Sequence, residues 1–180
     1  MKKMKKLSLG LILLIIILFT SSCEELFTTI AGMVSNDGIP KEGAIVLVLN
    51  ADASAYEKLS EINELSSSAL SALADVVKGF DIASDNNGNY LASMLSGGTV
   101  YVIAISDDGS DNLDSLDLVG WYGDVETIKI PNPYTGVDSI TVVYTDPNTI
   151  TIENGADTTG IDVVHMIEYW LLELVQEYLD

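Results

Sequence analysis

Apolar and polar residues alternate in several short stretches of the chain, and this period of two is typical of half-buried β-strands. Residues 28–35, TTIAGMVS, show the alternation, whereas residues 44–50, AIVLVLN, form an uncharged run that suits a strand buried on both faces. Between them, residues 36–43 are dense in turn-forming Asp-Gly, Pro and Gly. The pattern therefore predicts two strands that pair as a hairpin.

The spacing of apolar residues changes to three or four in residues 54–77, SAYEKLSEINELSSSALSALADVV. Ser, Glu and Asn fill the intervening positions, which is typical of an amphipathic helix. Asp52 or Ser54 could serve as the N-cap, and Gly79 follows as a stop signal. We expect a helix over 54–77, inserted at 52–78 between two strands and packed on the sheet.

Period two returns after this segment and continues through most of the chain. FDIASDNNGNYLASM and TVYVIAIS predict strands that reverse at residues 86–89 and at Gly97-Gly98. GWYGDVETIKI, DSITVVYT and NTITIENG predict three more short strands, separated by PNPYTG and DPN. Many short strands divided by Gly, Pro and Asn turns predict a β-sandwich or barrel.

The last stretch, TGIDVVHMIEYWLLELVQEYLD, combines the two periods. We expect a strand edge at 160–164 that runs into a C-terminal helix over 165–179. The apolar face of this helix is wide, so it must cover the sheet, the first helix or a partner.

The N-terminus has the order of a secretory signal peptide. Four lysines within residues 2–6 precede a nearly uniform apolar run, residues 7–19, and small residues follow at 20–22. The run is shorter than the roughly 20 apolar residues that a permanent span needs, although an uncleaved anchor helix remains the alternative. Cys23 is the only cysteine, so no internal disulfide can form.

The motif TSSC resembles the lipobox of bacterial lipoproteins, with Thr20 where leucine is usual. The resemblance implies a signal peptide at 1–22, lipidation of Cys23 and a short linker through residue 27. It also implies a lipid anchor in the bacterial envelope, expected at the outer membrane on either its periplasmic or its surface side. Several acyl chains hold a protein stably at a membrane, whereas one chain binds only marginally.

The net negative charge of the chain argues against anionic partners. The chain has 27 acidic residues against eight basic ones, a net charge of −19. Loss of residues 1–22 leaves four lysines against the same 27 acidic residues, a net charge of −23. Such a field repels nucleic acids and anionic lipid surfaces, so we expect no nucleic-acid partner and no basic membrane patch.

Three segments, IAGMVSNDGIPKEGAIVLVL, SDNNGNYLASMLSGGTVYVIAISDDG and ITIENGADTTGIDVV, resemble the carboxypeptidase regulatory-like domain. Asp85, Gly88 and Tyr90 fit its Asp-x-x-Gly-x-Tyr hairpin, and Gly98 begins a strand like its Gly-Thr-Tyr-x-Val strand. The resemblance implies an Ig-like, transthyretin-type β-sandwich of about seven strands over 28–164, followed by the C-terminal helix within 165–180. It does not imply peptidase activity, because the module accompanies catalysis located elsewhere.

Calcium is one candidate ligand, because carboxylate oxygens suit Ca²⁺ and one loop is rich in them. The candidate ligands are Asp107, Asp108, Asp111, Asp114 and Asp117. The spacing fails the EF-hand pattern, since Gly109 is at the third rather than the sixth position. Solvated turns in an acidic protein are the alternative interpretation.

Carbohydrate is a second candidate ligand, through the aromatic residues Trp121, Tyr122 and Tyr134. Such residues are also common as partly buried core. The only histidine, His165, lacks any accompanying nucleophile motif and is expected to be a cap or packing residue. The sequence therefore predicts a non-enzymatic envelope protein that interacts with another envelope component, with carbohydrate or Ca²⁺ binding as the alternative.

Overall fold

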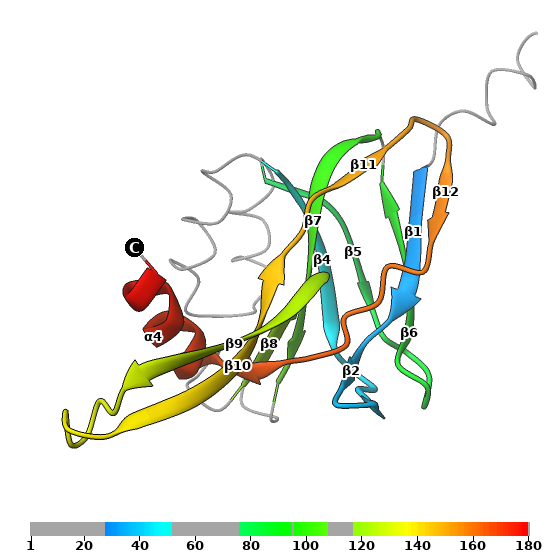
Figure 1. The fold of residues 1–180 in the computed structure, drawn as a ribbon. Coiled ribbons are helices and arrows are strands. Elements are labelled where there is room, and N and C mark those ends of the chain that lie inside the picture. Colours follow the sequence, from blue (N-terminus) through cyan, green and yellow to red (C-terminus); the bar gives the residue numbers. More distant parts are fainter. Residues whose placement is uncertain (1–27, 52–75, 95, 108–116, 180) are drawn as a thin grey trace, which may run out of the picture.

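The computed structural model describes residues 28–51, 76–94, 96–107 and 117–179, which are mainly β-strand with one C-terminal helix (Figure 1). Two sheets face each other across an apolar core, as a sandwich. The first has the strand order β12-β1-β6, and the second has the order β13-β8-β7-β4-β5. Strand β11 pairs with β7 beyond the end of β8. The prediction of a mainly β fold is confirmed.

The strands of the first sheet are β12 (Asp157–Thr159), β1 (Thr28–Met33) and β6 (Asn89–Met94). Those of the second are β13 (Ile167–Glu168), β8 (Leu118–Trp121), β7 (Gly98–Ser106), β4 (Ile45–Asn50), β5 (Val77–Ile82) and β11 (Ile150–Ile152). Two hairpins complete the strands: β2 (Ser35–Asn36) with β3 (Ile39–Pro40), and β9 (Gly123–Pro131) with β10 (Ser139–Pro147). Helix α4 covers Tyr169–Leu179.

The alternation along β4 and β7 divides their side chains between two cores. One set faces the first sheet and includes Val46, Val48 and Val102. The other set points to the opposite side and includes Leu47 and Ile103. All of these side chains are at most 3% exposed. The uncharged run 44–50 is therefore buried on both faces, as its composition predicted.

A third layer covers the outer face of the second sheet. Leu172 and Val175 of α4, with Ile130 and Tyr144 of the β9–β10 hairpin, pack in one cluster with residues of β4, β7 and β8. Figure 1 shows α4 beside this hairpin. Burying a Leu or Val side chain contributes roughly 1.5–3 kcal/mol, so α4 is held firmly by its own sheet. The sequence left the sheet, the first helix or a partner as possible neighbours of the apolar face of this helix. The structure shows that this face packs on the sheet.

The predicted pairing of residues 28–35 with 44–50 is wrong. Strand β1 belongs to the first sheet and β4 to the second, because the chain between them forms its own β2–β3 hairpin. Asp37 and Gly38 form its turn, both with positive φ (52° and 79°), which suits a two-residue hairpin.

The turn at residues 86–89 also changes sheets instead of closing a hairpin. Strand β5 pairs with β4 in the second sheet, and β6 pairs with β1 in the first. Gly88 allows this crossing, since it has φ of 73° and a Cβ there would lie 2.3 Å from the carbonyl oxygen of Val34. The reversal at Gly97-Gly98 likewise carries the chain from β6 in the first sheet to β7 in the second.

One helix prediction falls mostly outside the described residues, and the other needs correction. The predicted helix 54–77 lies outside the described residues except for Val76 and Val77, and Val77 begins strand β5. The C-terminal helix begins at Tyr169 rather than at residue 165. Residues 161–168 are extended because strands β1, β2 and β8 take their backbone hydrogen bonds, as in the bond from Val163 N to Met33 O of 2.9 Å.

Candidate functional site

The predicted lipidation residue Cys23 and the signal peptide lie outside the described residues. Strand β1 begins five positions after Cys23, a reach of at most about 18 Å. Its start is fixed, because Thr28 Oγ1 accepts a hydrogen bond from Gly155 N and Thr29 Oγ1 donates one to Asp157. In the part of the chain that the structure describes, no helix has the length and apolar character to cross a membrane.

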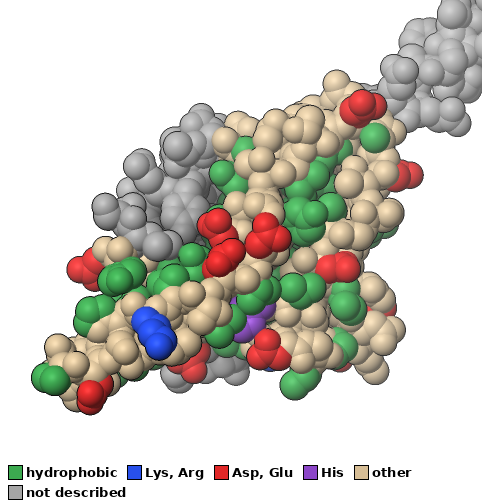
Figure 2. Space-filling model, in the orientation of Figure 1, with side chains coloured by type: hydrophobic (Ala, Val, Ile, Leu, Met, Phe, Trp, Pro, Cys, Tyr) green, Lys and Arg blue, Asp and Glu red, His purple; other side chains and the backbone are tan. Residues whose placement is uncertain are grey.

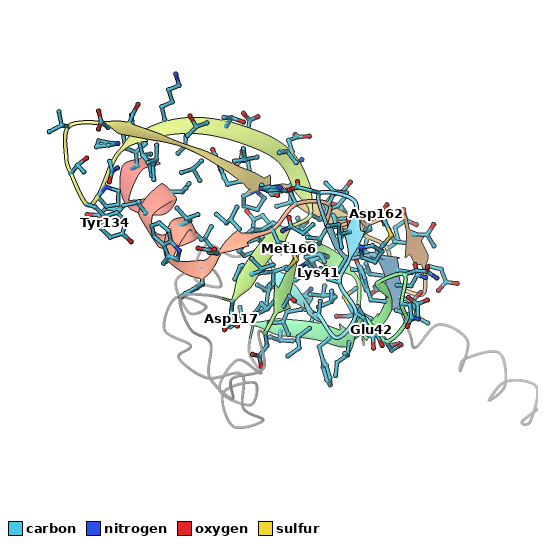
Figure 3. All side chains as sticks on the ribbon, turned by 90° about the horizontal axis from the view of Figure 1, so that it is seen from below. Lys41, Glu42, Asp117, Tyr134, Asp162 and Met166 are labelled. Carbon is cyan, nitrogen blue, oxygen red and sulfur yellow. The ribbon has the colours of Figure 1, made fainter. Side chains whose placement is uncertain are left out.

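The acidic loop is only partly described. Asp107 is exposed, Asp117 is fully buried, and the carboxylates at 108, 111 and 114 lie outside the described residues. The backbone oxygen of Asp117 accepts a hydrogen bond from Tyr169 N at 2.8 Å, so this residue lies at the start of α4 (Figure 3). Among the described residues, no three His, Cys, Asp or Glu side chains are grouped to hold a metal ion.

Asp85 shapes the turn at residues 85–89. Its carboxylate accepts hydrogen bonds from Asn89 N at 2.8 Å, Asn89 Nδ2 at 2.7 Å and Asn87 N at 3.0 Å. These donors stabilise the charged form and lower the pKa of Asp85 below its usual 3.8. The carboxylate is therefore engaged in holding the turn between the two sheets.

The three candidate carbohydrate-binding aromatics lie in different environments. Trp121 is 3% exposed and packs edge to face with Tyr101, at a ring separation of 6.0 Å. Its ring offers no open face for stacking on a sugar. Tyr122 is half-buried against the sandwich core. Tyr134 is 84% exposed at the tip of the β9–β10 hairpin, tilted on Trp170 with ring centroids 6.4 Å apart (Figure 3).

His165 joins three segments of the protein. Its Nδ1 lies 2.9 Å from Asp37 Oδ1 at the β2–β3 turn, and its Nε2 lies 3.1 Å from the carbonyl oxygen of Val143 in β10. A carbonyl oxygen only accepts, so Nε2 donates; the imidazolium form would also donate from Nδ1 to the carboxylate. Both ring nitrogens are thus engaged, which fits a packing role more closely than that of a helix cap.

The β9–β10 hairpin is the feature that the sequence prediction did not single out. The even-numbered residues of both strands share the inward face, which packs toward α4 and the second sheet. These residues are apolar near the tip and acidic near the base, where Asp124 lies directly opposite Asp146 in the register. Burial raises the pKa of Tyr144, and the nearby carboxylates of Asp146 and Glu126 raise it further. Figure 2 shows the hairpin extending from the body, with hydrophobic side chains exposed at its far end.

Strands β9 and β10 form a sheet of two strands in the described residues. The outer edge of β10 faces the segment that carries His165. Among the described strands, β9 pairs with β10 alone, and most of its residues are exposed. No sequence pattern marks the unpaired edge of β9, because an alternation with period two shows which face of a strand is buried and not whether its edge has a neighbouring strand.

Comparison with known proteins gives no relative: no family model matches the chain, and no curated protein or solved structure matches it. Function must therefore be argued from the residues themselves.

Proposed function

We propose that this protein is a non-enzymatic, lipid-anchored protein of the bacterial envelope, whose β-sandwich serves as a structural or interaction module. The observation that carries the proposal is the lone Cys23, placed after an apolar run and only five residues before strand β1. The anchor would be in the outer membrane, on its periplasmic or its surface side. With a net charge of −23 after processing, acyl chains and not basic residues would supply the membrane affinity.

Replacing Cys23 tests the tether directly. The variant Cys23→Ser is expected to lose processing and incorporation of a labelled fatty acid. Ser22→Ala is the matched control, since it keeps a small residue at the preceding position and leaves the thiol in place. If Cys23→Ser were still processed and still sedimented with the envelope as the control does, the lipid anchor would be wrong.

The proposal includes the relation to the carboxypeptidase regulatory-like domain. It is supported by the scaffold roles of the motif residues in this sandwich. Gly88 has a positive φ in the turn between the two sheets. Tyr90 is buried, and its hydroxyl donates a hydrogen bond to the backbone carbonyl of Ile161. Residues of this kind stabilise a fold and perform no chemistry, so the module would act through its surfaces.

A carbohydrate-binding accessory module is the second candidate. One observation favours it: Tyr134 is exposed and rests against Trp170, and aromatic pairs of this kind are suited to stacking on sugar rings. A glycan panel monitored by Trp fluorescence tests it. Tyr134→Ala should abolish a real signal, whereas Val137→Ala, at an equally exposed neighbouring position, should leave it unchanged. A response that survives Tyr134→Ala, or no response to any glycan, rejects this function.

A further inference from the structure

The hydrogen-bonding pattern of the hairpin shows which backbone groups β9 leaves open. Asn148 N donates to Tyr122 O and Asn132 N donates to Asp138 O, so the even-numbered residues form the hydrogen-bonded pairs between β9 and β10. The odd-numbered residues then turn their N–H and C=O groups away from the partner strand. On β9 these are Val125, Thr127 and Lys129, and the described residues place no strand beside them.

This edge has few of the features that prevent a strand from pairing with another chain. The β9–β10 register is continuous over nine residues, without a bulge. Proline occurs only at the last position, Pro131, and Lys129 is the single charge on the outward face of the strand. Long, regular edges are templates for a further strand, and proteins usually block them with bulges, prolines or several lysines.

Two other strand edges in the described residues are protected. On β6 the N–H of Leu91 donates to the Asp81 carboxylate of β5 at 2.6 Å, so a side chain occupies that edge. On β10, the carbonyl oxygen of Val143 accepts from His165. The described residues place no comparable side chain or strand along the edge of β9.

The side chains beside the edge define what a pairing strand must carry. Asp124 and Glu126 point to the inward face near the base, and Ile128 and Ile130 follow on the same face. Residues of a partner strand opposite the two carboxylates would be basic, and those opposite the two isoleucines apolar. On the outward face they would pair with Val125, Thr127 and Lys129, where β-branched residues and one acid fit.

A second copy of this chain does not meet these requirements. Antiparallel self-pairing centred on Thr127 would place Asp124 and Glu126 opposite Ile130 and Ile128, a charge against an apolar side chain in each case. Centring on Glu126 would place two glutamates opposite each other, which is destabilising. Each processed copy also has a net charge of −23, so the bodies repel.

We infer that the free edge of β9 is the docking site for an extended, basic segment of another protein, which adds a third strand to the β9–β10 sheet. This assigns a surface and a partner chemistry to the interaction module and rests on the proposed function in that respect. Backbone hydrogen bonds supply affinity in this mode, and alternate side chains supply specificity.

A designed peptide tests the inference on the full chain, purified in detergent. The capped peptide VEVTKTK places lysines opposite Asp124 and Glu126 and glutamate opposite Lys129 when it lies antiparallel to β9. NMR titration should shift the amide signals of Val125, Thr127 and Lys129, and added salt should weaken the binding. The charge-swapped peptide VKVTETE should bind at least about tenfold more weakly.

Two sets of variants make the result specific. Thr127→Pro removes an edge N–H that β10 does not use, and should weaken binding about tenfold, whereas Thr127→Val keeps the N–H and should bind like the original chain. The double change Asp124→Lys with Glu126→Lys should reverse the preference in favour of VKVTETE. This reversal does not depend on how well Thr127→Pro folds.

The inference would be overturned by the absence of shifts with VEVTKTK at millimolar concentration, by equal binding of both peptides, or by shifts away from the β9 edge. Concentration-dependent shifts of the same amides in the chain alone would show a second copy at the edge, and would overturn it also. The peptide result is independent of Cys23. Failure of docking and failure of the lipid tether are therefore separate findings.

Discussion

The phenol oxygen of Tyr90 lies 2.6 Å from the carbonyl oxygen of Ile161 and donates a hydrogen bond to it inside the sandwich core. Tyr90 belongs to β6, and Ile161 follows β12, so the bond joins segments that flank β1 on its two sides. The same carbonyl packs on Gly32 of β1, where a Cβ would approach its oxygen to 2.0 Å. One backbone group thus joins β1 and β6 to the segment that follows β12.

Removing the hydroxyl with Tyr90→Phe should lower the free energy of unfolding by about 1–2 kcal/mol, because the buried Ile161 carbonyl loses its phenol donor. Urea denaturation measures the change. Tyr122→Phe, at a half-buried position, is the control and should cost less. An unchanged stability in Tyr90→Phe would mean that water replaces the phenol at this carbonyl.

Alkaline pH should destabilise the protein through the same residue. Burial, then the negative charge of Asp162, raises the pKa of Tyr90 above its usual 10.0. The unfolded chain therefore releases this proton first, so the contribution of Tyr90 is complete below pH 10 and declines as the pH rises beyond it. The slope for one such group is about 1.4 kcal/mol per pH unit.

Stability measured between pH 9 and pH 11.5 checks this prediction. Tyr90→Phe should show a shallower decline than the unmodified protein, since phenylalanine has no proton to lose. Parallel declines in the two proteins would assign the alkaline sensitivity to other groups, such as Tyr144.

The turn residue Asp37 combines a positive φ of 52° with its contact to His165. Asp37→Asn should cost little, below about 0.5 kcal/mol, because asparagine tolerates this backbone conformation and the Asp37 carboxylate, 76% exposed, gains little from its contact with His165. Asp37→Ala should cost about 1–2 kcal/mol, since alanine adopts the left-handed region poorly. Thermal or urea unfolding of both variants makes the comparison. Equal losses would show that the charge, not the backbone, matters here.

Packing of α4 on its own sheet makes Val175 a stability residue. Val175 is 1% exposed, so Val175→Ala should lower the free energy of unfolding by at least about 1.6 kcal/mol, the transfer free energy of two methylene groups. Tyr178 on the same helix is 53% exposed, and Tyr178→Ala should change stability by less than about 0.5 kcal/mol. Similar small effects in both variants would indicate a helix that docks only loosely.

Sequence reasoning predicted faces well and neighbours poorly. The run 44–50 has no polar position, so burial on both faces followed directly from its composition. The same alternation is compatible with several partners, and β1 and β4 were therefore paired wrongly. Residues 165–168 have helical spacing, yet the edge of β8 offers backbone hydrogen bonds that keep residues 167 and 168 extended.

The prediction of candidate site residues from the sequence was limited for a related reason. Trp121 and Tyr134 are both aromatic residues in a strand-and-turn region, and only the fold reveals that one is in a core and the other at a hairpin tip. Asp117 is likewise part of an acidic run in the sequence, but it is fully buried beside the start of α4. Composition reports chemistry, whereas exposure depends on contacts between residues far apart in the chain.

The central position of β4 and β7 determines how the molecule can come apart. Each of these strands contributes alternate side chains to the apolar clusters above and below it, so neither cluster can be opened while the other keeps its full set of contacts. The sandwich and its outer layer should consequently melt together, as one cooperative transition. A chain truncated before Tyr169 would expose the apolar outer face of the second sheet to water and would be prone to aggregation.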